Sequence, residues 1–145
     1  MAMKYRFLFV SFCMLLAISG FAQKQYSLSS PDGKLKVTIG DGEALTWSIQ
    51  HEEIVVLQPS AIALNAINAK SNKKVGVWEG QVKVTNVARK SVNSSFATPF
   101  YKKAEVKDVY NQLSLTLKGG FVLEFRAYDE GAAYRIVSRQ SKPYL

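Results

Sequence analysis

The sequence has almost none of the side chains that carry thiol or redox chemistry. Its 145 residues include one cysteine, Cys13, and one histidine, His51. Cys13 lies inside an N-terminal apolar run, so a chain cleaved after Ala22 has no disulfide and no reactive thiol. A secreted domain without disulfides depends on its hydrophobic core. This suits a bacterial periplasmic protein better than a small eukaryotic extracellular module.

The only long apolar run stands at the N-terminus. Lys4 and Arg6 precede the apolar run 7–20, and Gly20 and Ala22 supply the small residues of a cleavage site. This three-part pattern predicts a secretory signal peptide over residues 1–22, cleaved near Ala22. The run is short for a spanning helix and polar residues follow it at once, so a retained membrane anchor is the weaker alternative. We expect a periplasmic or secreted domain over 23–145, with no stable membrane anchor.

The positive net charge is not gathered into a dense basic cluster. Lysine and arginine number 19 against 11 acidic residues, for a formal net charge of +8. Lysines are scattered along the chain, from Lys34 and Lys36 to Lys102, Lys103 and Lys107, without interleaved aromatic residues. That pattern is typical of solvated strand faces and loops rather than of a nucleic-acid site. No nucleic-acid partner is expected.

Motifs for phosphate binding, nucleophilic catalysis and metal binding are also absent. Gly119-Gly120 lies between predicted strands rather than before a helix, which excludes a phosphate-binding loop. Nothing near His51 indicates a nucleophile elbow. The triplet 51–53, His-Glu-Glu, is isolated, and the sequence 129–131, Asp-Glu-Gly, is first of all a turn signal. We assign no metal ligand in this chain.

The best-defined structure is predicted for the stretch 110–136. Leu113, Leu115 and Leu117 alternate with polar residues, so their side chains fall on one face of a strand. The two glycines of Lys118-Gly119-Gly120 can both take the positive φ of a tight hairpin turn. A second strand follows from Phe121 to Arg126.

A second turn, Asp129-Glu130-Gly131, leads into a third strand of this stretch. We expect Tyr128 and Tyr134 to pack against each other across the turn. Arg126 and Arg135 flank the same turn, and we expect them to pair with Glu124 or Asp129 across the strands.

Period-two alternation also covers the rest of the mature chain. It predicts strands over 35–39, 45–49, 54–57, 75–78, 82–87 and 104–109, and no amphipathic helix. Residues 65–74 are expected to form an exposed loop, and 86–98 either a loop or a weak edge strand. Trp47 is expected in the core, whereas Trp78, at a strand end, is a candidate for exposure. The fold class is therefore all-β, an antiparallel β-sandwich of roughly eight to ten short strands.

Two motifs carry a family resemblance. The stretch Y-N-Q-L-S-L-T-L followed by F-V-L-E-F-R-A-Y-D-E-G-A-A-Y-R-I, and the opening S-P-D-G-x-L-x-V-x-I, resemble the N-terminal region of glycoside hydrolase family 97. The resemblance implies a β-super-sandwich that precedes a (β/α)₈ catalytic barrel. It also implies a calcium-dependent α-glucosidase or α-galactosidase as the full-length protein, acting on oligo- or polysaccharides. The segment up to Leu145 would then be an incomplete sandwich that packs on the barrel and shapes the rim of its active site.

Glycoside hydrolysis needs two carboxyl groups that face each other across the scissile bond. Residues on different strands cannot be paired by sequence spacing, so we name no catalytic residue and no substrate-binding residue here. The resemblance places the catalytic carboxylates beyond Leu145. The candidates by residue type are Glu43, Glu52, Glu53, Glu79, Glu105, Asp108, Glu124, Asp129 and Glu130.

Two other classes of function stay open. The chain is alternatively a non-catalytic, secreted carbohydrate-binding or adhesive sandwich, or a structural module that binds a protein through an exposed sheet edge. The residues present do not separate glucosidase from galactosidase, nor retention from inversion.

Overall fold

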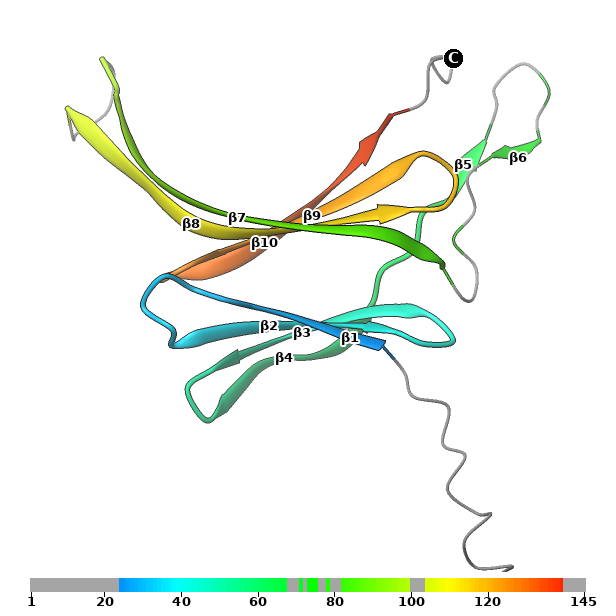
Figure 1. The fold of residues 1–145 in the computed structure, drawn as a ribbon, viewed down its shortest axis with the longest axis horizontal. Helices are drawn as coiled ribbons and strands as arrows, with labels where there is room; N and C mark the ends of the chain where they lie inside the picture. The colour runs from blue at the N-terminus through cyan, green and yellow to red at the C-terminus, as the bar shows by residue number, and fades with distance from the viewer. Residues whose placement is uncertain are drawn as a thin grey trace, which may run out of the picture.

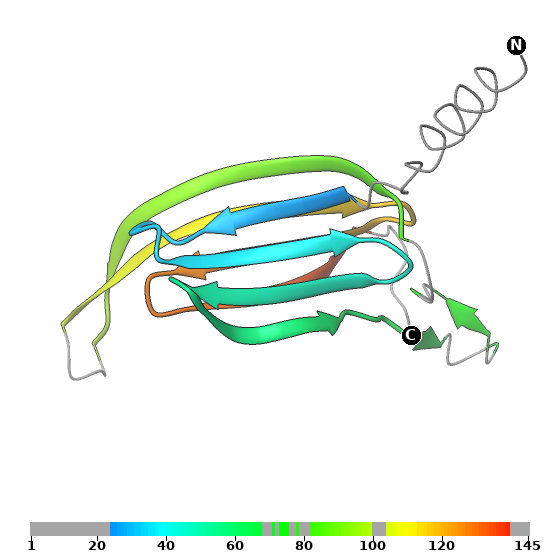
Figure 2. The same cartoon turned by 90° about the horizontal axis from the view of Figure 1, so that it is seen from below.

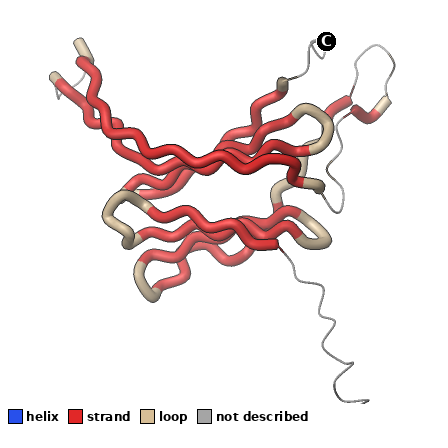
Figure 3. The backbone as a smooth tube through the Cα atoms, viewed as in Figure 1, coloured by secondary structure: helices blue, strands red, loops and turns tan. Residues whose placement is uncertain are grey.

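A computed structural model of the chain describes residues 24–67, 71, 73–75, 78, 82–99 and 104–139. The predicted signal peptide, 1–22, lies outside the described residues. Within the described part, ten β-strands form two four-stranded antiparallel sheets and one two-stranded ribbon (Figures 1 and 3). The prediction of an all-β sandwich is confirmed. No helix in the described ranges is long and apolar enough to span a bilayer.

The first sheet is an up-and-down meander of neighbouring strands. Its order is β1 (Lys24–Ser29), β2 (Leu35–Asp41), β3 (Leu45–His51) and β4 (Ile54–Ala61). Gly33, with φ +78°, closes the turn from β1 to β2, where a side chain would be strained. Glu52 takes φ +52° in the tight turn from β3 to β4.

The second sheet has the order β10-β9-β8-β7. Its strands are β7 (Val84–Ala97), β8 (Glu105–Leu117), β9 (Phe121–Tyr128) and β10 (Gly131–Ser138). Gly119 and Gly120, with φ +104° and +80°, form the β8–β9 turn, as predicted. The strands predicted separately over 104–109 and 113–117 are one strand, β8. The segment 86–98, left open as loop or weak strand, is largely edge strand β7.

The predicted loop 65–74 is only partly irregular. It contains β5 (Ala66–Ile67) and the first residue of β6 (Lys74–Val75), which pair as a short antiparallel ribbon. Residues 68–70 and 72 lie outside the described residues.

Apolar residues of both sheets meet in a shared core. Val37 and Ile39 of β2, and Leu113, Leu115 and Phe125 of the second sheet, are completely buried. Trp47 packs against this core from β3, as expected. These residues come from alternate positions of their strands, which is why the period of two predicted them.

Trp78 corrects the prediction of an exposed tryptophan. Its side chain is only 7% exposed, and its ring lies edge-on to Phe121 with centroids 5.4 Å apart. The Trp78 backbone N–H also donates to the Leu64 carbonyl at 3.0 Å. Trp78 is buried by its contact with Phe121, which is distant in the sequence, so no local pattern reveals it.

The two sheets are offset sideways (Figure 2). β1 packs on β8 and β9, β2 packs on β9, and Trp47 of β3 contacts Tyr134 of β10. β4 therefore extends past β10 on one flank, and β7 extends past β1 on the other. Neither β4 nor β7 contains a buried residue.

Candidate functional site

The outer surface of the second sheet carries an ordered set of polar and aromatic side chains. Odd-numbered residues of β8, such as Leu113, face the core, so even-numbered ones face outward. β9 pairs with β8 so that Arg126 lies opposite Gln112 and Glu124 lies opposite Ser114, which places both on the same outer face. We call this set the polar face; its members are Tyr110, Gln112, Ser114, Glu124, Arg126, Tyr128 and, from β10, Arg135.

Gln112 is the centre of the polar face. It is only 5% exposed, although it lies on the side of the sheet away from the core. Its Nε2 donates to Ser114 Oγ at 3.0 Å, and its Oε1 accepts from Arg126 Nε at 3.2 Å. Gln112 and Arg126 are direct cross-strand neighbours. A buried amide without these partners would destabilise the fold, so the network is held together as a unit.

An aromatic pair lies beside this amide. The guanidinium carbon of Arg126 lies 4.4 Å from the centroid of the Tyr110 ring, within the range of a cation–π contact. Tyr110 in turn contacts Tyr128, with centroids 5.1 Å apart and a 47° tilt. The pKa of Arg126 is raised, chiefly because its side chain hydrogen-bonds with Tyr128. The cation is thus fixed over a ring.

One ion pair on this face confirms a prediction. Arg135 Nε lies 2.6 Å from Glu124 Oε2, and the two residues are cross-strand neighbours. The structure gives Arg126 other partners than the expected carboxylates, namely Gln112 and the two tyrosines.

The predicted packing of Tyr128 on Tyr134 is wrong. The tight turn pairs Tyr128 with Gly131, so Tyr134 falls opposite Phe125, on the core side of the sheet. The Tyr134 ring contacts Phe125 and Trp47, with centroids 5.7 Å and 5.0 Å apart. The two tyrosines point to opposite faces of their hairpin.

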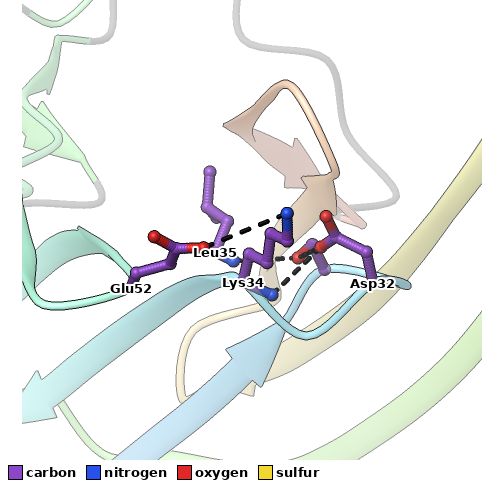
Figure 4. A network of polar contacts seen from close by, with 5 residues as sticks. Asp32, Lys34, Leu35 and Glu52 are labelled. Carbon is purple, nitrogen blue, oxygen red and sulfur yellow. Dashed lines mark hydrogen bonds and ion pairs between the residues drawn. The ribbon is translucent and has the colours of Figure 1, made fainter.

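The two motifs that carry the family resemblance meet in space. In the turn from β1 to β2, Asp32 Oδ1 accepts from Ser30 Oγ at 2.5 Å and from the Lys34 N–H at 3.0 Å (Figure 4). The backbone N–H of Asp32 donates to Asp129 Oδ1 at 2.9 Å, which joins this turn to the turn before β10. Lys34 Nζ also lies 3.9 Å from Glu52 Oε1. These hydrogen bonds therefore form a clamp between the turns of the two sheets.

The clamp holds its carboxylate in the charged form. Hydrogen bonds from the Ser30 hydroxyl and then from the Lys34 backbone lower the pKa of Asp32 below its ordinary value of 3.8. A charged group held this way is typical of a structural turn as well as of an active site. Asp32 does not line either of two grooves of the domain, one beside Arg89 and Asn111 and the other beside Glu105 and Lys107.

The candidate carboxylates are not brought together. Glu124 pairs with Arg135, Asp129 binds the Asp32 N–H, and Glu105 accepts from the Ser95 hydroxyl. Glu43, Glu52, Glu53 and Glu130 are exposed in turns, Asp108 lies on β8, and Glu79 falls outside the described residues. Among the residues described, no three of His, Cys, Asp and Glu lie close enough to hold a metal ion.

A shallow groove of about 400 Å³ runs between β1 and the β7–β8 hairpin. Arg89 Nη1 donates to the Ser27 carbonyl at 2.6 Å, and Asn111 Nδ2 donates to the Ser29 carbonyl at 2.9 Å. These side chains cap the free edge of β1. Asn111 Oδ1 also accepts from Ser91 Oγ at 2.6 Å, so both polar atoms of the Asn111 amide are engaged. The two side chains therefore protect this edge of the sandwich.

The polar face was not predicted as a unit. The sequence indicated a solvent-exposed strand face at Ser114 and Thr116, but it did not indicate that Gln112 and Tyr110 would be buried on that face. The missing information was the register of β8 against β9, which places Arg126 next to Gln112. A run of alternating Tyr, Gln and Ser opposite Arg and Glu was the available signal.

The described residues thus form a disulfide-free antiparallel sandwich with a polar outer face. The comparisons with known proteins identify its family. Residues 28–143 match the family model described as "Glycosyl-hydrolase 97 N-terminal". The chain belongs to the N-terminal domain family of glycoside hydrolase family 97.

Individual relatives agree. A retaining alpha-galactosidase of Bacteroides thetaiotaomicron is 40% identical over 136 residues, which cover 94% of this chain and 20% of that protein. A family 97 enzyme of Pseudoalteromonas sp. strain K8 in complex with acarbose matches with a TM-score of 0.66 and 25% identity. The match covers 78% of this chain and 17% of the enzyme, and a variant in complex with panose matches equally. The chain thus spans about a fifth of the length of these relatives.

Proposed function

We propose that this chain is the N-terminal sandwich portion of a family 97 glycosidase that hydrolyses α-galactosides or α-glucosides. The observation that carries the proposal is the family match over residues 28–143. The 40% identity to a retaining alpha-galactosidase favours α-galactosides. The complex of a similar enzyme with acarbose keeps α-glucosides as the other substrate class.

The role proposed for this portion is to support the catalytic barrel rather than to carry out the chemistry. Its described carboxylates are separated and mostly engaged in turns and ion pairs. The polar face offers a rigid surface for another domain, because Gln112, Arg126 and Tyr110 are already fixed by one another. Packing of the barrel there would need no reordering of these side chains.

Calcium, which the family resemblance implies for the full-length enzyme, does not fit the described residues. No three of His, Cys, Asp and Glu lie together in that part of the chain. We therefore assign this portion no calcium ligand and no step that passes through the ion.

Export to the periplasm is proposed from the leader alone. Cleavage after Ala22 would leave Gln23 as the first residue, just ahead of β1. Intact-mass analysis of the protein from its native host tests this. Retention of residues 1–22 in the mature protein would contradict it.

The enzymatic proposal is tested with the protein made from its complete gene. We expect release of p-nitrophenol from p-nitrophenyl α-galactoside, or from the matching α-glucoside, and none from the β-anomers. Hydrolysis of neither α-glycoside by a folded, full-length protein would overturn the proposal. Binding of the same sugars without turnover would instead support the carbohydrate-binding alternative.

A further inference from the structure

The flank formed by β4 and β10 exposes an apolar surface. Ile54, Val55 and Val56 stand in sequence at the start of β4 and are 70%, 50% and 63% exposed. Tyr134 of β10, whose ring borders the core, is 38% exposed. We call this surface the open flank. Exposed clusters of large apolar side chains mark interaction surfaces.

The offset of the two sheets explains why this surface is bare. Ile54 pairs with His51 and Leu57 pairs with Ile49, so both lie on the face of the first sheet that carries the core. The strand of the second sheet nearest this flank is β10, which lies opposite β3. No described strand of the second sheet lies across from β4 (Figure 2). The core-facing side of β4, which includes Ile54, therefore has no strand opposite it.

The opposite flank of the sandwich is closed. There the side chains of Arg89 and Asn111 hydrogen-bond to carbonyls at the free edge of β1. Among the described residues, β4 has no comparable cap; the Ser60 hydroxyl bonds only to the Gln58 carbonyl within the same strand. Within the described ranges, side chains thus cap the flank at β1, and none caps the flank at β4.

The two strands of the open flank differ in their capacity to accept a further strand. β4 contains Pro59, which lacks an N–H, and its pairing with β3 is interrupted by register shifts. Both features discourage addition of a strand at that edge. β10 pairs with β9 without interruption from Gly131 to Ser138. A new strand fits beside β10, and from there its side chains would cover Ile54.

We propose that a later segment of the same polypeptide adds a strand beside β10 and covers the apolar face of β4. This inference rests on the proposed function, because it takes the occupant from the part of the enzyme beyond this chain. The matched relative is about five times as long as the segment it shares with this chain. A second copy of the chain is the competing occupant.

The test compares two adjacent positions of β4 in the protein made from its complete gene. Ile54 faces the core layer, whereas Val55 pairs with Gln50 on the other face of the same sheet. The I54C and V55C variants are labelled with a maleimide, and the unsubstituted protein gives the background. We expect I54C to react at least about tenfold more slowly than V55C, because the added strand covers only the face of β4 on which Ile54 lies.

Equal labelling rates at the two positions, whether both fast or both slow, would overturn the proposal. Protection of I54C that weakens on dilution would also overturn it, because it would identify a second copy as the occupant. If I54C does not fold, hydrogen exchange of the unsubstituted protein decides. In an edge strand, every second backbone N–H points away from the sheet and exchanges fast. If a further strand pairs with β10, the amides of Gly131–Ser138 should all exchange slowly; if the edge is free, alternate amides should exchange fast.

The glycosidase assay separates this inference from the proposed function. An inactive protein with a covered Ile54 would reject the enzyme and keep the docking surface. An active enzyme with a freely labelled I54C would reject the docking surface alone.

Discussion

Replacement of Phe125 by alanine tests the packing of the two sheets. Phe125 is completely buried on β9, and its ring lies against Trp47 of the first sheet, with centroids 6.3 Å apart. It also contacts Tyr134, at 5.7 Å. The ring therefore links the sheets at the border of the open flank.

The expected cost follows from the cavity that the substitution leaves. Phe-to-Ala changes in cores cost about 3–5 kcal/mol of unfolding free energy. Trp47 and Tyr134 are both partly exposed and free to move into the space, so we expect about 3 kcal/mol, near the lower limit. In a domain of this size that corresponds to a fall in Tm of roughly 12 °C.

Urea unfolding followed by tryptophan fluorescence measures the effect, because Trp47 reports on the same contact. The matched control is Phe96→Ala on β7, where the phenyl ring is 53% exposed. We expect the control to change the stability by no more than about 0.5 kcal/mol. A cost below about 1 kcal/mol for Phe125→Ala, or equal costs for the two variants, would refute the packing described.

Two further predictions concern the polar groups. Gln112→Leu leaves Arg126 without its amide partner and should cost about 1–3 kcal/mol in urea unfolding. Gln58→Leu, at an exposed site on β4, should be nearly neutral. Similar costs for the two variants would contradict a specific network. Asp32 has a lowered pKa in the folded state, so it contributes stability above its ordinary value of 3.8 that is lost as the pH falls through the lower folded value. The Tm of Asp32→Asn should therefore fall less than that of the unsubstituted protein below about pH 4, and parallel curves would count against the clamp.

Local sequence signals account for most of the strands. The alternation of Leu113, Leu115 and Leu117 and the pair Gly119-Gly120 predicted the central hairpin because pleat and turn chemistry agree there. The edge strand β7 was ambiguous, since its Ser- and Asn-rich sequence has no buried face. An edge strand is held mainly by pairing with its neighbour, here β8. The local sequence of β7 does not reveal its register against β8.

The features that the sequence did not predict depend on contacts between distant segments. Trp78 is buried by Phe121, and Tyr134 is turned to the core by the two-residue turn before it. The burial of Gln112 on an outer face follows from the register of β8 against β9. The family resemblance pointed to two sequence motifs, one containing Asp32 and the other Asp129. Only the fold shows that a hydrogen bond between these two residues connects the motifs.

The most direct test of the central claim is the sequence of the gene downstream of codon 145. We expect the reading frame to continue through alternating β and α segments of a catalytic barrel, with acidic residues at the ends of strands. A stop codon immediately after Leu145 would contradict it. The chain would then be a sandwich without a catalytic domain, and glycan binding would replace hydrolysis as the function to measure.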